Sequence, residues 1–169
     1  FFLFSLAMDN FDYSIEGADI EYDDGNNPTQ IDLLFRAAKT GRFDDFKTTL
    51  FSSKLRLNVQ DGLGNTALHY AAAGDHPRIA HFILKTDPKV INISNNIGDT
   101  PLHKAAGRAK SQVIRLLIDF GGDVLAKNHE DQRPMDIAKD PEVIEMLTPS
   151  ALGDYSDDED MDPFGDDGA

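Results

Sequence analysis

The sequence predicts an all-α solenoid of stacked helix–turn–helix units with long hairpin-like loops. Three observations predict it. The segment 66–72 (TALHYAA) recurs 34 residues later at 100–106 (TPLHKAA), weaker copies lie about one period away on each side, and each copy precedes an apolar stripe at helical spacing. A repeat of this length marks units that cannot bury their apolar faces alone and therefore stack.

The opening unit, residues 29–50, is predicted to be an end unit. Thr29 and Asp32 form a helix-start signal, and Gly41 lies in the turn between two helices. Ile31 and Asp32 stand where the full units have Thr and Pro or Ala, as expected of a unit whose outer face meets water. The apolar positions of its two helices are Leu33, Leu34, Ala37, Ala38, Phe43, Phe46 and Leu50.

Two full units follow the opening unit. In each, a Thr caps the first helix, and in the later one Pro101 suits the first helical position. The connection 107–110 leads to Ser111, which we expect to cap the next helix, and Gly121 or Gly122 supplies the left-handed residue that ends it. The apolar stripes of the second helices are Ile79, Phe82, Ile83 and Leu84, and then Val113, Ile114, Leu116, Leu117 and Ile118.

A compressed fourth unit is predicted to close the stack. Residues 134–138 repeat 101–105 at a distance of 33, and a second short helix begins after Pro141. Thr148 and Pro149 stop this helix.

Residues 66–72 and 100–106 resemble the T-P-L-H-x-A-A motif of the ankyrin-repeat family, and the likeness covers about residues 29–148. The resemblance implies two full repeats between degenerate N- and C-terminal capping units. Three positions depart from the family pattern: Asp75 and Ala109 replace the usual Gly between helices, and Leu125 replaces a loop Asn. These departures affect local turns and leave the fold assignment in place.

The net charge of −14 is unevenly distributed along the 169 residues. Residues 1–30 carry 7 acids and residues 154–169 carry 8, neither with Lys or Arg, which leaves 15 acids and 16 bases between them. This argues against direct nucleic-acid binding. The chain has no Cys, which is typical of a reducing compartment, so we expect a cytoplasmic or nuclear location. No apolar run approaches the ~18 residues of a membrane span.

Both ends of the chain are predicted to be disordered: a leader, 1–28, rich in acids and aromatics, and an acidic tail, 149–169. For residues 1–7 we favour an upstream extension that is not native, with Met8 as the start, over the remnant of a signal peptide. For residues 9–27, a solvated leader competes with a recognition peptide or a strap on the first repeat. Ser156 precedes three acids and is a candidate phosphorylation site.

No residue set points to catalysis, a metal or a cofactor. His69 and His103 occupy equivalent places in successive units, too far apart to share a metal at about 2.1 Å. The ankyrin resemblance implies that both bond to turn backbone. Gly62 and Gly64 lack the third Gly and the preceding strand of a phosphate-binding loop. No residue therefore supports the hypothesis of an enzymatic function.

The resemblance implies a protein partner held on the loop tips and on the concave face of the first helices. The exposed apolar pair Leu63 and Ile97 suggests either a contact patch or loop-against-loop packing. The candidate residues at the tips are Gln60, Gly62, Leu63, Asn65, Ser94, Asn96, Ile97, Asp99, Lys127, His129, Glu130 and Gln132. Those on the helices are Lys39, Thr40, Ala73, Gly74, Gly107 and Arg108.

The sequence-based hypothesis for function is a monomeric, non-catalytic adaptor or escort for a basic protein, such as a ribosomal protein or a histone, which the acidic ends would attract. The alternative is a fragment or subunit of a larger ankyrin scaffold whose acidic ends only keep it soluble.

Overall fold

The computed structural model describes residues 29–148, and within this range the chain is all-α, with no strand. The leader 1–28, the tail 149–169 and the candidate site Ser156 lie outside the described residues. No helix between residues 29 and 148 has the length and apolarity needed to cross a bilayer. The helices are α1 (Gln30–Thr40), α2 (Phe43–Ser53), α3 (Ala67–Gly74), α4 (Pro77–Thr86), the 3₁₀ helix η1 (Pro88–Asn92), α5 (Pro101–Ala106), α6 (Ser111–Asp119), α7 (Pro134–Ile137) and α8 (Pro141–Leu147).

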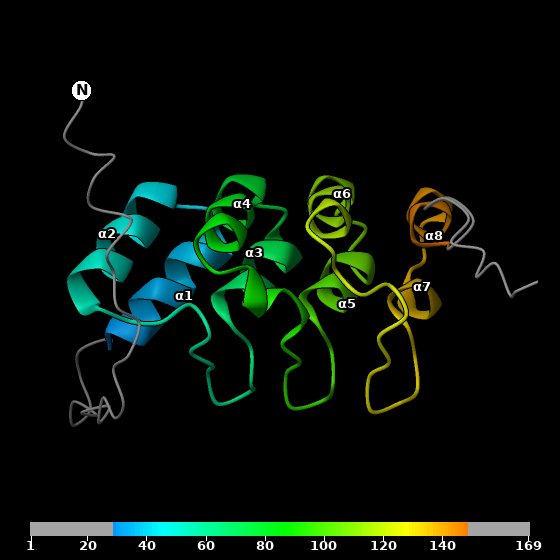
Figure 1. Cartoon of the computed structure of the whole chain (residues 1–169), viewed down its shortest axis with the longest axis horizontal. Coiled ribbons are helices and arrows are strands. Elements are labelled where there is room, and N and C mark those ends of the chain that lie inside the picture. Colours follow the sequence, from blue (N-terminus) through cyan, green and yellow to red (C-terminus); the bar gives the residue numbers. More distant parts are fainter. Residues whose placement is uncertain (1–28, 149–169) are drawn as a thin grey trace, which may run out of the picture.

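The helices form two parallel rows, confirming the predicted solenoid (Figure 1). The first helices of the units, α1, α3, α5 and α7, contact one another in sequence, and so do the second helices, α2, α4, α6 and α8. Three hairpin-like loops extend from the first-helix row. We call them fingers and define them as residues 59–66, 93–100 and 126–133.

The core lies between the two rows. Leu68 and Leu102 occupy equivalent places in α3 and α5, and both are fully buried. Met135 in α7 is only partly buried, and among residues 29–148 no further unit covers it. Ala71, Ala72, Ala105 and Ala106 are also buried, and their small side chains let neighbouring helices approach closely. In the second row, Ile79, Ile83, Val113 and Leu117 are completely buried.

The helix starts follow the sequence signals with one exception. Thr29 and Asp32 form the predicted capping box of α1, and Thr100 precedes Pro101 as the cap of α5. Ser111 does not cap α6: Lys110 holds that place, and Ser111 is the first helical residue. That prediction was wrong by one position: the non-helical backbone ends at Lys110 (φ −94°, ψ 71°), so Ser111 already lies inside the helix.

Two positions where the family has Gly adopt the left-handed conformation that Gly favours. Asp75 has φ = 59° and Ala109 has φ = 53°. A left-handed L-residue other than Asn or Asp costs about 1–2 kcal/mol, so Ala109 is under more strain than Asp75.

We expect Ala109→Gly to raise the free energy of unfolding by about 0.5–1 kcal/mol, because relief of the strain exceeds the entropy that glycine adds to the unfolded chain. Ala109 is exposed, so no packing is lost. Asp75→Gly is the matched control. Its free energy of unfolding should rise less, because the variant loses the Asp75 carboxylate that accepts a hydrogen bond from the Val113 amide at 3.4 Å. Urea unfolding measures both; an Ala109→Gly chain that is less stable than wild type would contradict the expectation.

Candidate partner-binding surface

Each finger is closed by one Asp or Asn side chain. The Oδ1 atom of Asp61 accepts bonds from the amides two and four residues later, at 2.9 and 2.8 Å. Asn95 does the same at 3.1 and 3.0 Å, and Asn128 at 3.0 and 3.0 Å. The three fingers therefore have one shape, set by side chains that mimic a backbone turn.

Neighbouring fingers are bonded to each other. The Asn96 amide donates to the Leu63 carbonyl and the His129 amide to the Ile97 carbonyl, both at 3.0 Å. Two side chains reinforce the first contact: Gln60 Nε2 donates to the Ser94 carbonyl, and Asn96 Nδ2 donates to the Gly62 carbonyl, each at 3.0 Å. The tips are thus held in a fixed row before any partner arrives, which lowers the entropy lost on binding.

Two buried histidines anchor the fingers to the helices, confirming the predicted bonds to turn backbone. His69 Nδ1 accepts from the Thr66 amide at 3.0 Å, so its Nε2–H donates to the Asp99 carbonyl of the next finger, also at 3.0 Å. His103 makes the same bonds to Thr100 and Gln132. Burial lowers the pKa of His69 to about 4 and keeps the ring neutral.

Two carboxylates inside the fingers are held ionised. Burial raises the pKa of Asp99, but bonds from Lys104 Nζ at 2.9 Å and Asn128 Nδ2 at 3.0 Å outweigh it, and the pKa is lowered overall. Burial likewise raises the pKa of Asp61, and the Tyr70 hydroxyl and backbone amides bring it below its ordinary value. Both side chains are structural parts of the loops.

The structure separates the predicted tip residues into two groups. Asn65 and Asp99 are buried, with only 7% of each exposed, and Asn65 Oδ1 accepts from Asn95 Nδ2 at 2.9 Å. They join fingers and do not face outward, so we remove both from the predicted surface. Gln132 is half-buried. The remaining tip residues are exposed: Gln60, Gly62, Leu63, Ser94, Asn96, Ile97, Lys127, His129 and Glu130.

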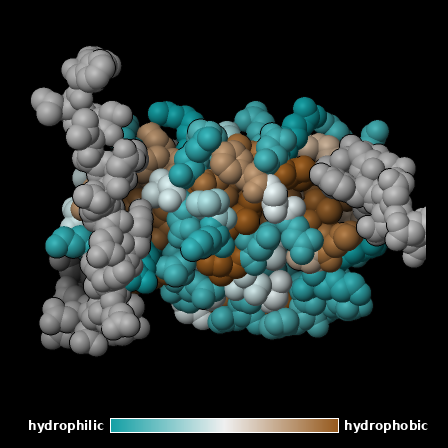
Figure 2. Space-filling model, viewed as in Figure 1, coloured by the Kyte–Doolittle hydropathy of each residue, from teal (hydrophilic) through white to brown (hydrophobic). Residues whose placement is uncertain are grey.

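Leu63 and Ile97 form an apolar step along the tips. Their exposed fractions are 65% and 57%, although their backbones are bonded to adjacent fingers. Loop-against-loop packing would have buried these two side chains, so the structure does not show that packing, and the contact patch stays a prediction. Figure 2 shows a mostly hydrophilic lower edge where the fingers lie, and hydrophobic residues exposed in patches over the helix rows.

The predicted helix residues are less uniform. Lys39, Thr40, Gly107 and Arg108 are exposed, while Ala73 and Gly74 are half-buried. A Cβ on Gly74 would lie 2.5 Å from the His76 Nε2 atom. His76 bonds to the Lys39 carbonyl at 3.0 Å and links the first two units. Gly74 is therefore needed for packing between units.

The described residues offer no arrangement for metal chemistry: between residues 29 and 148, no three His, Asp or Glu side chains are grouped to hold an ion. Sequence reasoning missed the finger-closing residues Asp61, Asn95 and Asn128. Their spacing of 34 and then 33 residues was the signal that could have found them, since it matches the repeat.

Comparisons with known proteins agree with this geometry. The family model for ankyrin repeats (three copies) matches residues 34–128. Ankyrin repeat and SOCS box protein 5 of Oryctolagus cuniculus is 43% identical over an alignment of 54 residues, and the match covers 28% of this chain and 16% of that protein. The matched stretch thus covers about one sixth of the length of the curated relative.

Proposed function

Because the chain belongs to the ankyrin-repeat family, we propose that it is an adaptor or escort that holds a basic protein, such as a ribosomal protein or a histone, against its fingers. Ankyrin repeats indicate a protein–protein interaction module, and the family is in general a non-catalytic scaffold. Stacked repeats of this kind present extended concave surfaces to their partners. A cytoplasmic or nuclear location and a monomeric state belong to the same proposal.

The observation that supports this use of the surface is the exposed apolar step of Leu63 and Ile97. Hydrogen bonds hold both residues in place, and neither contributes to the buried core. Apolar anchors held in position, with polar neighbours such as Gln60 and Asn96 around them, are the usual centre of a protein interface.

Charge supports the basic nature of the partner. The segment 31–153 is nearly neutral, with 15 acids and 16 bases, whereas the two ends carry 15 acids and no base. Long acidic segments raise the association rate of a basic partner without reading its sequence, and salt weakens this attraction. The ends would speed the encounter while the tips provide the specific contact.

The test is affinity capture from a lysate with the full chain, followed by binding measurements on the recovered basic proteins in purified form. We expect the double variant Leu63→Ser, Ile97→Ser to weaken binding at least tenfold. Each apolar side chain that becomes buried when the partner binds contributes about 1.5–3 kcal/mol to the binding free energy. Leu125→Ser is the matched control: Leu125 is 54% exposed but lies just before the third finger, and its change should leave binding intact.

Removal of residues 154–169 should slow association at low salt and leave dissociation almost unchanged. Recovery of the same basic proteins by the Leu63→Ser, Ile97→Ser variant would refute the finger tips as the binding surface. Recovery of no basic protein by the intact chain would refute the proposed escort function.

A second candidate is a segment of a larger ankyrin scaffold, in which the acidic ends only maintain solubility. One observation favours it: the match to the rabbit relative covers 16% of that protein, so similar repeats occur within a much longer chain. Sequencing the complete transcript around this coding region distinguishes the two candidates.

A further inference from the structure

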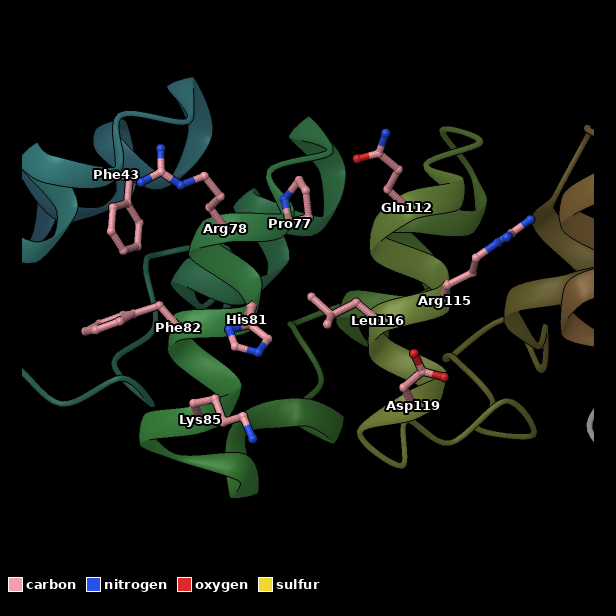
Figure 3. A pocket seen from close by; sticks show the side chains of 10 residues that line it. All are labelled: Phe43, Pro77, Arg78, His81, Phe82, Lys85, Gln112, Arg115, Leu116 and Asp119. Carbon is pink, nitrogen blue, oxygen red and sulfur yellow. The ribbon is translucent and has the colours of Figure 1, made fainter.

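The second-helix row carries an open groove between α4 and α6, on a different part of the molecule from the fingers (Figure 3). One end of α2 contributes to it through Phe43, and Leu116 of α6 faces His81 of α4 across the gap. The lining combines aromatic and apolar side chains with cations, among them Phe43, Arg78, His81, Phe82, Lys85 and Leu116.

Aromatic rings form one wall of the groove. The Phe82 ring is edge-on to Phe43 and Phe46, at centroid distances of 5.7 and 6.3 Å. It also meets Phe51 at 6.4 Å, and the Phe51 side chain is 64% exposed. An aromatic cluster that is only half covered can still gain stability when another apolar or aromatic group covers it.

Two cations on α4 lie over aromatic rings. The Arg78 guanidinium is 4.7 Å from the Phe43 ring centroid, and Lys85 Nζ is 5.5 Å from that of Phe120. Among the described residues, neither Arg78 nor Lys85 has a carboxylate within ion-pair distance. Their charges therefore remain available to an anionic group.

Two other charged side chains line the groove. Arg115 points towards α8, where it lies 3.5 Å from Glu142, and Asp119 is the acid of the lining. Lys47 of α2, whose Nζ atom is 5.7 Å from the Phe43 ring centroid, lies outside the lining. Of the cations in the lining, the two open to an anion are Arg78 and Lys85 on α4. These are seven residues apart, which is about 10.5 Å along a helix.

We propose that this groove docks the acidic segment 154–169 of the same chain. The segment carries 8 acids and no base, and it contains Tyr155 and Phe164, so its chemistry matches both the cations and the aromatic wall. Asp157 and Asp160 are three residues apart, about 10 Å in an extended chain, which fits the spacing of Arg78 and Lys85.

The connection is long enough and starts on the correct row. α8 ends at Leu147, and it is the next second helix after α6. The groove is at most two helix spacings away, or roughly 20 Å. Residues 148–157 can span about 30 Å. The acidic leader instead joins the chain at α1, in the first-helix row, which makes it the less suitable occupant.

A spin label on the tail tests the docking in the full chain. Because the chain has no Cys, Met161→Cys provides a unique attachment site. We expect the amide NMR signals of residues 78–85 to lose most of their intensity near about 0.1 M salt. They should recover near about 1 M salt, where the screening length falls from about 10 Å to about 3 Å.

Charge reversal at the groove supplies the decisive comparison. Arg78→Glu with Lys85→Glu should restore the intensities at low salt, because both side chains are at the surface and their attraction becomes repulsion. Lys39→Glu with Arg108→Glu makes the same change in net charge at two exposed positions, one in α1 and one in the turn after α5, and should leave the broadening in place.

Three results would overturn the proposal. They are broadening centred on the fingers or spread evenly over the protein, equal recovery with both charge-reversal pairs, and broadening that appears only between a labelled and an unlabelled copy in a mixed sample. The last would assign the groove to a second molecule. None of these results depends on whether Leu63 and Ile97 bind a basic partner.

Discussion

Replacing Leu102 with Ala should lower the free energy of unfolding by about 2–5 kcal/mol, because it opens a cavity in the middle of the stacked core. Leu102 is 1% exposed in α5, which contacts both α3 and α7. In a stack where each unit contacts only its neighbours, a cavity at this place weakens two interfaces at once. Residues 29–148 form four units, and a stack of that size has little stability to lose.

Two further variants show whether stacking is the cause. Met135→Ala should cost clearly less than Leu102→Ala, because Met135 is only partly buried in the final unit. Ile97→Ala should change stability by no more than about 0.5 kcal/mol, since that side chain is 57% exposed at a finger tip. Urea unfolding gives all three values. If Leu102→Ala were as mild as Ile97→Ala, the stacked core would not be what holds the protein together.

Acidification from pH 6.5 to 4 should remove up to about 3 kcal/mol of stability through His69 alone. Burial lowers its pKa from 6.5 to about 4 in the folded protein. Protonation would also place an N–H on Nδ1, facing the Thr66 amide that now donates to it. Between the two pKa values the unfolded chain binds the proton and the folded one does not. This stability is therefore complete above pH 6.5 and lost progressively down to pH 4, at about 1.4 kcal/mol per pH unit.

The Asp61 and Asp99 carboxylates affect the free energy of unfolding at lower pH than His69 does, so the two effects can be measured separately. The pKa values of Asp61 and Asp99 are lowered from 3.8, so the stability that these groups contribute disappears only as the pH falls below about 4. The measurement is urea unfolding at a series of pH values, with an NMR titration of the His69 ring. His69→Gln should flatten the slope between pH 6.5 and 4, and His129→Gln, at an exposed tip, should not. A His69 ring that titrates near 6.5 in the folded protein would contradict the expectation.

The Leu63 and Ile97 variants test binding only if their free energy of unfolding stays close to that of the wild type. A serine at Leu63 or Ile97 can be interpreted as a binding effect only if the fold survives, and the exposure of both side chains predicts that it will. The same holds for Arg78 and Lys85 in the groove, which contribute their charges at the surface and not within the core.

The repeat period predicted the order of the helices, and local start and stop signals predicted most of their ends. Thr29, Thr100 and Pro101 act within one turn of their own helix, so their roles follow from neighbouring residues. The apolar stripes could also be predicted from the sequence, because each helix in a stack buries the equivalent face. Ser111 was the exception, since the left-handed residue Ala109 is followed by Lys110 as the last non-helical residue, and Ser111 is already helical.

Only the tertiary structure decided which polar residues face outward. Asn65 and Asp99 occupy tip positions by sequence, yet contacts between fingers bury them. Their partners lie 29 or 30 residues away, a separation at which no local pattern shows which side chains meet. The groove beside α4 also depends on three helices from different units. Local chemistry therefore determined the helices, whereas the stacking of units decided which side chains remain free to bind.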